Sequence, residues 1–134
     1  MPHARRIRIA IAAAAATIVS TAIAATPALA ASRDITPPSA PTIIYAQGYN
    51  CLQVIVAVTR STDNVTPQSQ LLYTVFANGK AIGTVPDRGD GAGVWAWLQN
   101  VLTPGTDTIT VKAEDAAGNF SSPSSPVVVT GYPC

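Results

Sequence analysis

The sequence contains few of the side chains that carry out most enzyme chemistry. Only 11% of its 134 residues are charged, and it has a single histidine and two cysteines. The histidine, His3, lies in an N-terminal segment that we expect to be removed. A serine or threonine nucleophile would then have only Lys80 or Lys112 as a base. A pair of carboxylates would need a cleft, which so small a domain seldom has. We therefore predict that the protein is not an enzyme.

A surplus of positive charge is missing too. Beyond residue 30 the chain has five basic side chains against seven acidic ones, which leaves a net charge of −2. Nucleic-acid binders use clustered lysine and arginine to neutralise phosphates, so the charge balance excludes that function. The remaining 104 residues suffice for one domain with its own core, but not for a multidomain enzyme.

The N-terminus has the three parts of a secretory signal peptide. Three arginines within the first eight residues precede an uncharged apolar stretch over residues 9–25, and Ala-Leu-Ala at 28–30 suits a signal peptidase. A retained membrane anchor is the alternative, but the stretch is shorter than the ~20 apolar residues that a span needs. We predict that residues 1–30 are a signal peptide, and that the mature protein is secreted without a membrane span.

Residues 31–41 form a Pro- and Ser-rich lead-in that prolines keep extended, and residues 42–134 have the pattern of an all-β domain. Apolar and polar side chains alternate with a period of two, and turn residues such as Asn78-Gly79 interrupt them about every ten positions. This spacing is typical of a seven-stranded antiparallel β-sandwich. The expected strands are residues 42–47, 51–59, 71–77, 80–85, 94–98, 108–113 and 127–130.

Several segments resemble bacterial fibronectin type III domains, whose immunoglobulin-like relatives share much of the pattern. The resemblance lies in the leading segment at 34–41 (DITPPSAP), in 61–64 (STDN), in 73–75 with Asn78-Gly79, and in 115–119 (DAAGN). It implies a fibronectin type III or immunoglobulin-like sandwich of the kind found as non-catalytic modules in secreted carbohydrate-active enzymes, adhesins and cell-surface proteins. The chain departs from the family at Val58, where a core tryptophan is usual.

The two cysteines, Cys51 and Cys134, lie in the mature part of the chain. An even number of cysteines in an exported chain indicates a disulfide rather than metal ligands. In the sandwich that the resemblance implies, the start of the second strand and the end of the seventh lie at the same pole. The fold therefore predicts a Cys51–Cys134 bridge.

The same topology gathers aspartates at the opposite pole. Asp34, Asp63 and Asp115, together with Asp87 and Asp90, lie on loops that converge there. Several carboxylates could bind Ca²⁺, which takes six to eight oxygen ligands, and calcium is the one cofactor that the pattern suggests. The alternative is that each aspartate caps the backbone of its own turn, with nearby arginines neutralising the charge.

Trp95 and Trp97 alternate around Ala96, so both indoles point to one face of their strand. Exposed, they would form a platform for a sugar ring or a proline-rich peptide. Because two neighbouring exposed tryptophans are unusual, and because the usual core tryptophan is missing, we expect at least one of them in the core. Arg88 lies in the glycine-rich loop at 86–93, within an Arg-Gly-Asp tripeptide that ends at Asp90.

These observations predict a secreted, non-catalytic binding or adhesion module. Its partner would be a polysaccharide or an extracellular protein, recognised through Trp95, Trp97 and Arg88. The alternative function is a secreted protein inhibitor of an extracellular hydrolase, in which the loop at 86–93 enters the active site of the target.

Overall fold

The computed structural model describes residues 33–89, 91 and 93–134. The predicted signal peptide lies outside these residues, as does Asp90. The described part of the chain contains one three-residue 3₁₀ helix, η1 (Gln68–Gln70), and no helix in it is long and apolar enough to cross a bilayer. Its seven strands are β1 (Ile43–Tyr49), β2 (Gln53–Val58), β3 (Leu72–Ala77), β4 (Lys80–Pro86), β5 (Val94–Leu98), β6 (Gly105–Glu114) and β7 (Val127–Gly131).

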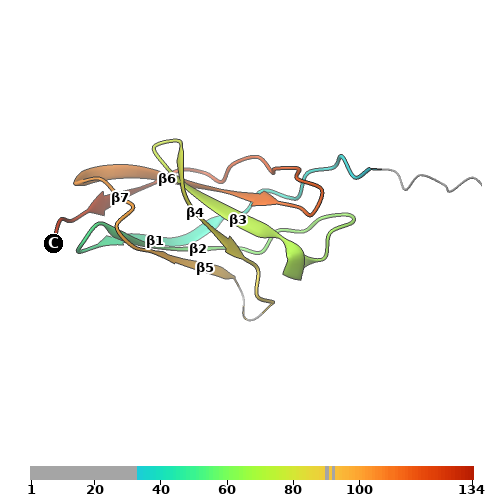
Figure 1. The fold of residues 1–134 in the computed structure, drawn as a ribbon, viewed down its shortest axis with the longest axis horizontal. Coiled ribbons are helices and arrows are strands. Elements are labelled where there is room, and N and C mark those ends of the chain that lie inside the picture. The colour runs from blue at the N-terminus through green and yellow to red at the C-terminus, as the bar shows by residue number, and fades with distance from the viewer. Residues whose placement is uncertain (1–32, 90, 92) are drawn as a thin grey trace, which may run out of the picture. The chain divides into compact units, whose positions relative to one another are not determined.

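The strands form two antiparallel sheets that pack face to face. One sheet has the order β1-β2-β5 and the other β4-β3-β6-β7. Figure 1 shows the layers, with β6 and β7 above β1 and β2. The two-residue turn between β3 and β4 is formed by Asn78 and Gly79, which both have positive φ, as a tight hairpin requires. The predicted all-β sandwich of seven antiparallel strands is confirmed.

β1 ends at Tyr49 rather than at residue 47, and two strands start more than one residue away from the predicted position; the other boundaries differ by at most one residue. β2 begins at Gln53 rather than at residue 51, because Cys51 and Leu52 have φ values of 62° and 56° and belong to a turn. β6 begins at Gly105 rather than at residue 108, since its first residues pair with the end of β7. Both shifted starts depend on neighbouring strands and turns, which the alternation within a single strand does not reveal.

The core lies between the sheets and consists mainly of β-branched side chains. β2 contributes Val54, Val56 and Val58 from its inner face. The largest fully buried side chain is that of Tyr73 on β3, and its hydroxyl oxygen accepts a hydrogen bond of 2.7 Å from the backbone N–H of Ser61. A single aromatic side chain therefore fills the centre, and its polar end is satisfied inside the core.

The expectation that at least one indole fills the core is wrong. Trp95 is 62% exposed and Trp97 65% exposed, whereas Val94 and Ala96 of the same strand are buried. In the β2–β5 register Val94 lies beside Val58 and Ala96 beside Val56, so the inner face of β5 continues a row of small side chains. Facing sheets stand about 10 Å apart, which leaves little room for two indoles beside Tyr73.

The edges of the two sheets approach each other where β1 meets β7. A Cβ atom at Gly48 would lie 1.9 Å from the carbonyl oxygen of Thr130, well inside van der Waals contact. Only glycine fits at this position, because any side chain would separate the two strands.

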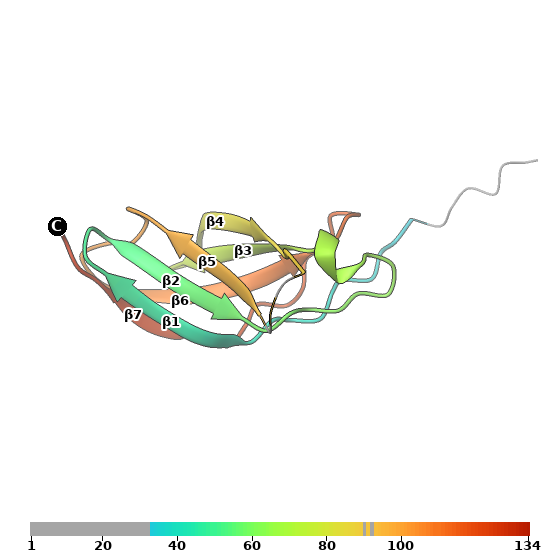
Figure 2. The same cartoon turned by 90° about the horizontal axis from the view of Figure 1, so that it is seen from below.

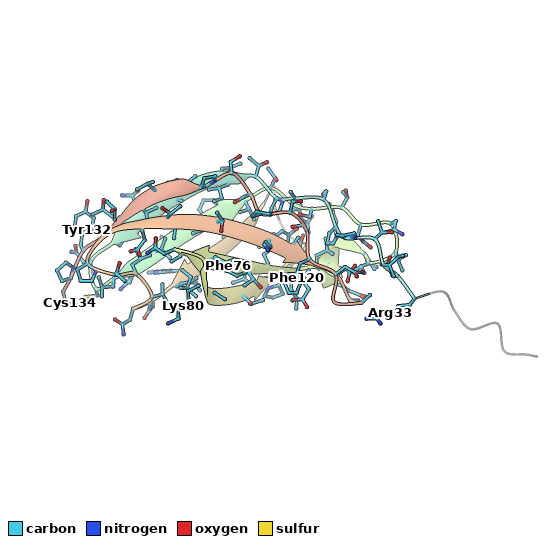
Figure 3. All side chains as sticks on the ribbon, turned by 90° about the horizontal axis from the view of Figure 1, so that it is seen from above. Arg33, Phe76, Lys80, Phe120, Tyr132 and Cys134 are labelled. Atoms are coloured by element: carbon cyan, nitrogen blue, oxygen red, sulfur yellow. A yellow bond between two sulfur atoms is a disulfide. The ribbon has the colours of Figure 1, made fainter. Side chains whose placement is uncertain are left out.

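The predicted disulfide between Cys51 and Cys134 is confirmed. It closes a segment with a sequence separation of 83 residues, and the adjacent backbone N–H of Leu52 donates to the carbonyl of Tyr132 at 2.9 Å. Figure 3 places Tyr132 and Cys134 at the end of the sandwich opposite Arg33. The bridge therefore fixes the C-terminal residues to the turn that precedes β2.

Candidate functional site

The outer surface of the smaller sheet carries a group of exposed aromatic rings, which we call the aromatic face. It consists of Tyr45 and Tyr49 on β1 and Trp95 and Trp97 on β5, all exposed. Figure 2 shows β2 running between these two strands. The strand registers align Tyr45 with Trp95 through Ala57, and Gln47 with Trp97 through Ile55. The face thus extends across all three strands of the sheet.

Two rings of the aromatic face meet over the central strand. The ring centroids of Tyr45 and Trp95 lie 5.9 Å apart, with an interplanar angle of 39°. Ala57, directly between them, is fully covered. A methyl side chain at this position lets the two rings approach each other, and such tilted pairs favour a fixed geometry.

Hydrogen bonds hold the rings in place. The indole N–H of Trp97 donates to Oε1 of Gln53 at 3.1 Å. The hydroxyl of Tyr45 donates to Oε1 of Gln47 and lies 2.9 Å from the hydroxyl of Tyr49. The hydrogen bond with Tyr49 raises the pKa of Tyr45 above its ordinary value of 10.0, and burial adds to the shift.

Two hollows flank the aromatic face. A groove of about 620 Å³ follows the outer edge of β5, where Trp95 and Trp97 form one wall and Arg88 contributes to the other. A smaller hollow of about 380 Å³ lies near the disulfide, lined by residues that include Tyr49, Gln53 and Tyr132. The structure therefore brings together all three predicted ligand-binding residues, Trp95, Trp97 and Arg88.

The loop that carries Arg88 is anchored through its neighbour Asp87. The guanidinium of Arg60 donates from Nε to both carboxylate oxygens, at 3.0 and 2.9 Å, and from Nη2 to Oδ1. The backbone N–H of Gly89 donates to the same carboxylate at 2.8 Å. The hydrogen bonds from Arg60 lower the pKa of Asp87 and outweigh the opposing effect of burial. Of the Arg-Gly-Asp tripeptide, Arg88 and Gly89 are described, whereas Asp90 is not.

At the opposite end from the disulfide, the structure brings together three of the predicted aspartates. Carboxylate oxygens of Asp34, Asp63 and Asp115 lie within 4.8 Å of one another. We call these three residues the aspartate cluster. Asp87 does not join it, because its carboxylate is paired with Arg60.

Each member of the aspartate cluster caps a turn, as the alternative interpretation predicts. Oδ1 of Asp34 accepts from the N–H of Thr36 at 3.1 Å, and Oδ2 of Asp63 accepts from the N–H groups of Val65 and Thr66 at 2.9 and 2.7 Å. Asp115 is buried, which raises its pKa. Hydrogen bonds from the side chain and backbone of Asn119, and from nearby backbone N–H groups, outweigh that effect and lower the pKa overall.

Sequence reasoning missed the β1 half of the aromatic face. Tyr45, Gln47 and Tyr49 alternate along β1 and so point to one side. That alternation was the available signal. It does not show that β1 and β5 both pair with β2, and this strand order is what brings the tyrosines beside the tryptophans.

No family model matches the chain. Chitinase A1 of Niallia circulans is 34% identical over 96 residues, which span 72% of this chain but only 12% of the chitinase. Among solved structures, the fibronectin(III)-like modules of Clostridium thermocellum CbhA match with a TM-score of 0.52 at 17% identity, over 74% of this chain and 48% of theirs. A human fibronectin type III domain matches with a TM-score of 0.51 at 18% identity, over 78% and 94%. The chain has a fibronectin type III-like fold.

This fibronectin type III-like sandwich distributes its aromatic residues unusually. Val58 occupies the position where the resemblance led us to expect a core tryptophan, and it packs within the core. Both tryptophans of the chain stand on the outer surface of the smaller sheet. The outer face of β1-β2-β5 therefore carries four exposed aromatic rings.

Proposed function

We propose that the protein is a secreted, non-catalytic module that binds a neutral polysaccharide chain through its aromatic face. The observation that supports this proposal best is the arrangement of four exposed rings on β1 and β5, three of which are held by hydrogen bonds to one another or to glutamines. Monomeric proteins rarely expose large apolar surfaces without a use for them.

The chemistry of the aromatic face suits sugars. One side of a sugar ring presents C–H groups that stack against a flat aromatic side chain, while its rim presents hydroxyls. The side-chain amides of Gln47 and Gln53 lie among the rings and can both donate and accept hydrogen bonds. Apolar contact with a few polar groups that fix orientation is the usual composition of a ligand site.

The charge of this surface favours a neutral ligand. The described strands β1, β2 and β5 contain no Asp, Glu, Lys or Arg residue. Arg88 contributes a single positive charge at the edge of the groove. A strongly anionic polymer would have little to pair with here, since charged partners are selected by complementary charge.

Most of the rings are already held in place before a ligand binds, and this favours affinity. Trp97, Tyr45 and Tyr49 already make hydrogen bonds on the surface, so binding would immobilise few additional rotors. The hollows on either side of the face extend the surface beyond the rings. A chain of several sugars fits such an extended surface better than a single sugar does.

The similarity to a chitinase suggests the first ligand to test. Chitin is the polymer in the name of that relative, Chitinase A1, and the match covers 72% of the present chain. We therefore choose insoluble chitin as the primary probe, with cellulose as a second neutral polymer.

The proposal is tested by depletion of the full chain from solution by insoluble chitin and cellulose. We expect the wild-type protein to bind at least one polymer, and Trp97→Ala to weaken that binding at least tenfold, which is about 1.4 kcal/mol. Phe120→Ala is the matched control, because Phe120 is also an exposed aromatic residue but lies outside the aromatic face. It should bind like the wild type.

Two outcomes would contradict the proposal. Binding that Trp97→Ala leaves unchanged would exclude the aromatic face. Failure to bind either polymer, combined with stoichiometric inhibition of a secreted hydrolase that is lost in Arg88→Ala, would instead favour the inhibitor function.

A further inference from the structure

The aspartate cluster joins three segments that are far apart in the sequence. Asp34 belongs to the lead-in, Asp63 follows β2, and Asp115 follows β6. Their carboxylate oxygens lie within 4.8 Å of one another. Three negative charges at such distances repel each other strongly unless something neutralises them.

Two oxygens of the cluster are buried without a partner. Oδ2 of Asp34 and Oδ1 of Asp63 are shielded from solvent and accept no hydrogen bond. The other oxygen of each carboxylate is used by its turn, so turn capping explains only half of each group. A buried carboxylate oxygen without a partner is costly, and such an atom requires an explanation.

The described side chains do not supply the missing positive charge. The ion pair of the described residues is that of Arg60 with Asp87, and it lies outside the cluster. Asn119 donates from Nδ2 to Oδ2 of Asp115 at 2.7 Å and to the backbone carbonyl of Asp34 at 3.1 Å. Asn119 therefore connects the Asp34 and Asp115 segments, but its neutral amide adds no charge to the cluster.

We propose that the aspartate cluster is a Ca²⁺ site, in which the unpartnered oxygens of Asp34 and Asp63 and the carboxylate of Asp115 bind the ion. Carboxylate and carbonyl oxygens are the ligands that Ca²⁺ takes, and waters commonly complete its six to eight positions. The three ligands come from three separate loops, and Ca²⁺ tolerates irregular geometry better than Mg²⁺ does. Zinc sites usually include histidine nitrogen or cysteine sulfur, and the described cluster contains neither.

The ion would fasten the lead-in to the sandwich. Residue 39 already contacts the loop after β2, where the N–H of Ser39 donates to the carbonyl of Thr62 at 2.9 Å. Calcium would add a charged connection from Asp34 to both Asp63 and Asp115. This role is independent of polysaccharide binding, because the aspartate cluster and the aromatic face share no residue.

The site is tested by thermal unfolding of the full chain in Ca²⁺ and in excess chelator, at matched ionic strength. For the wild type we expect the midpoint to rise by about 10 °C when Ca²⁺ is a hundredfold above its dissociation constant. Isothermal titration of the wild type with Ca²⁺ should show one site. Equal midpoints in Ca²⁺ and chelator, or no heat of binding, would overturn the proposal.

Asp63→Asn separates metal binding from turn capping. Its remaining oxygen can still accept from Val65 and Thr66, while an NH₂ group replaces the unpartnered oxygen. We expect it to lose the rise with Ca²⁺ yet to be at least as stable as the wild type in chelator, because one repulsive charge is gone. The control variant Glu114→Gln removes one charge next to the cluster, and its unfolding midpoint should still rise when Ca²⁺ is added. Two results would show that the Asp63 carboxylate only caps its turn and does not bind Ca²⁺. In one, the unfolding midpoint of Asp63→Asn still rises with Ca²⁺; in the other, the variant is destabilised equally with and without Ca²⁺.

Discussion

At the scale of single residues, Asp87 shows how one side chain positions a functional loop. Its carboxylate is buried, accepts hydrogen bonds from Arg60 and Gly89, and directly precedes the exposed Arg88. Arg60 has other interactions in addition to this pair. The groove wall formed by Arg88 therefore depends on a partly buried ion pair rather than on the loop sequence itself.

Asp87 makes the stability of the protein depend on pH. Hydrogen bonds from Arg60 hold its pKa below the ordinary 3.8, so its contribution is present above that value and is lost as the pH falls through the lower, folded pKa. We predict that Asp87→Asn lowers the free energy of unfolding by about 2 kcal/mol at neutral pH. The difference from the wild type should shrink below about pH 4. Urea unfolding over a pH series measures this, and a difference that stays constant in acid would contradict it.

At the scale of strands, the contact between β1 and β7 closes one edge of the sandwich. We predict that Gly48→Ala destabilises the protein by about 3 kcal/mol, because the new methyl group would displace Thr130 and separate the two strands. Gln47→Ala, on the outer face of the same strand, serves as the control and should change stability by less than about 0.5 kcal/mol. Chemical unfolding of both variants measures the effect. Equal losses of stability would show that the close approach of β1 and β7 does not cause the destabilisation.

The strands were predictable because most of them bury a single face. Alternation along residues 108–113 directly encodes which side faces the core. β5 is different, since Val94, Ala96 and Leu98 are as apolar as the tryptophans between them. The orientation of β5 depends on its register with β2 and on the space between the sheets, and neither is visible in a local pattern.

The candidate sites were predictable to different degrees for the same reason. The aspartate cluster followed from the alternation of strand direction, which places particular loops at one pole. The tyrosines of β1 did not, because their approach to Trp95 requires knowledge that β2 lies between β1 and β5. The pole at which a loop lies follows from counting strands that alternate in direction. A surface formed by several strands depends instead on the order of those strands in the sheet.

At the scale of the whole molecule, the disulfide stabilises the domain by closing a long segment. The chain-entropy estimate for such a loop is about 4–5 kcal/mol. We predict that the Cys51→Ser, Cys134→Ser double variant loses up to this amount and binds polysaccharide as the wild type does. Urea unfolding and the depletion assay measure the two effects. Loss of binding in a folded variant would show that the bridge also shapes the hollow beside it.

The bridge also determines how the molecule would respond to tension. A force applied between residue 33 and Cys134 passes through the covalent link to Cys51, so residues 52–133, which the bridge closes into a loop, bear no load. Only residues 33–51, the lead-in and β1, can be drawn out, to about 60 Å at most. The core of the sandwich and both tryptophans lie inside the shielded segment, so a stretched protein would keep β2 to β7 intact while β1 peels away with its two tyrosines.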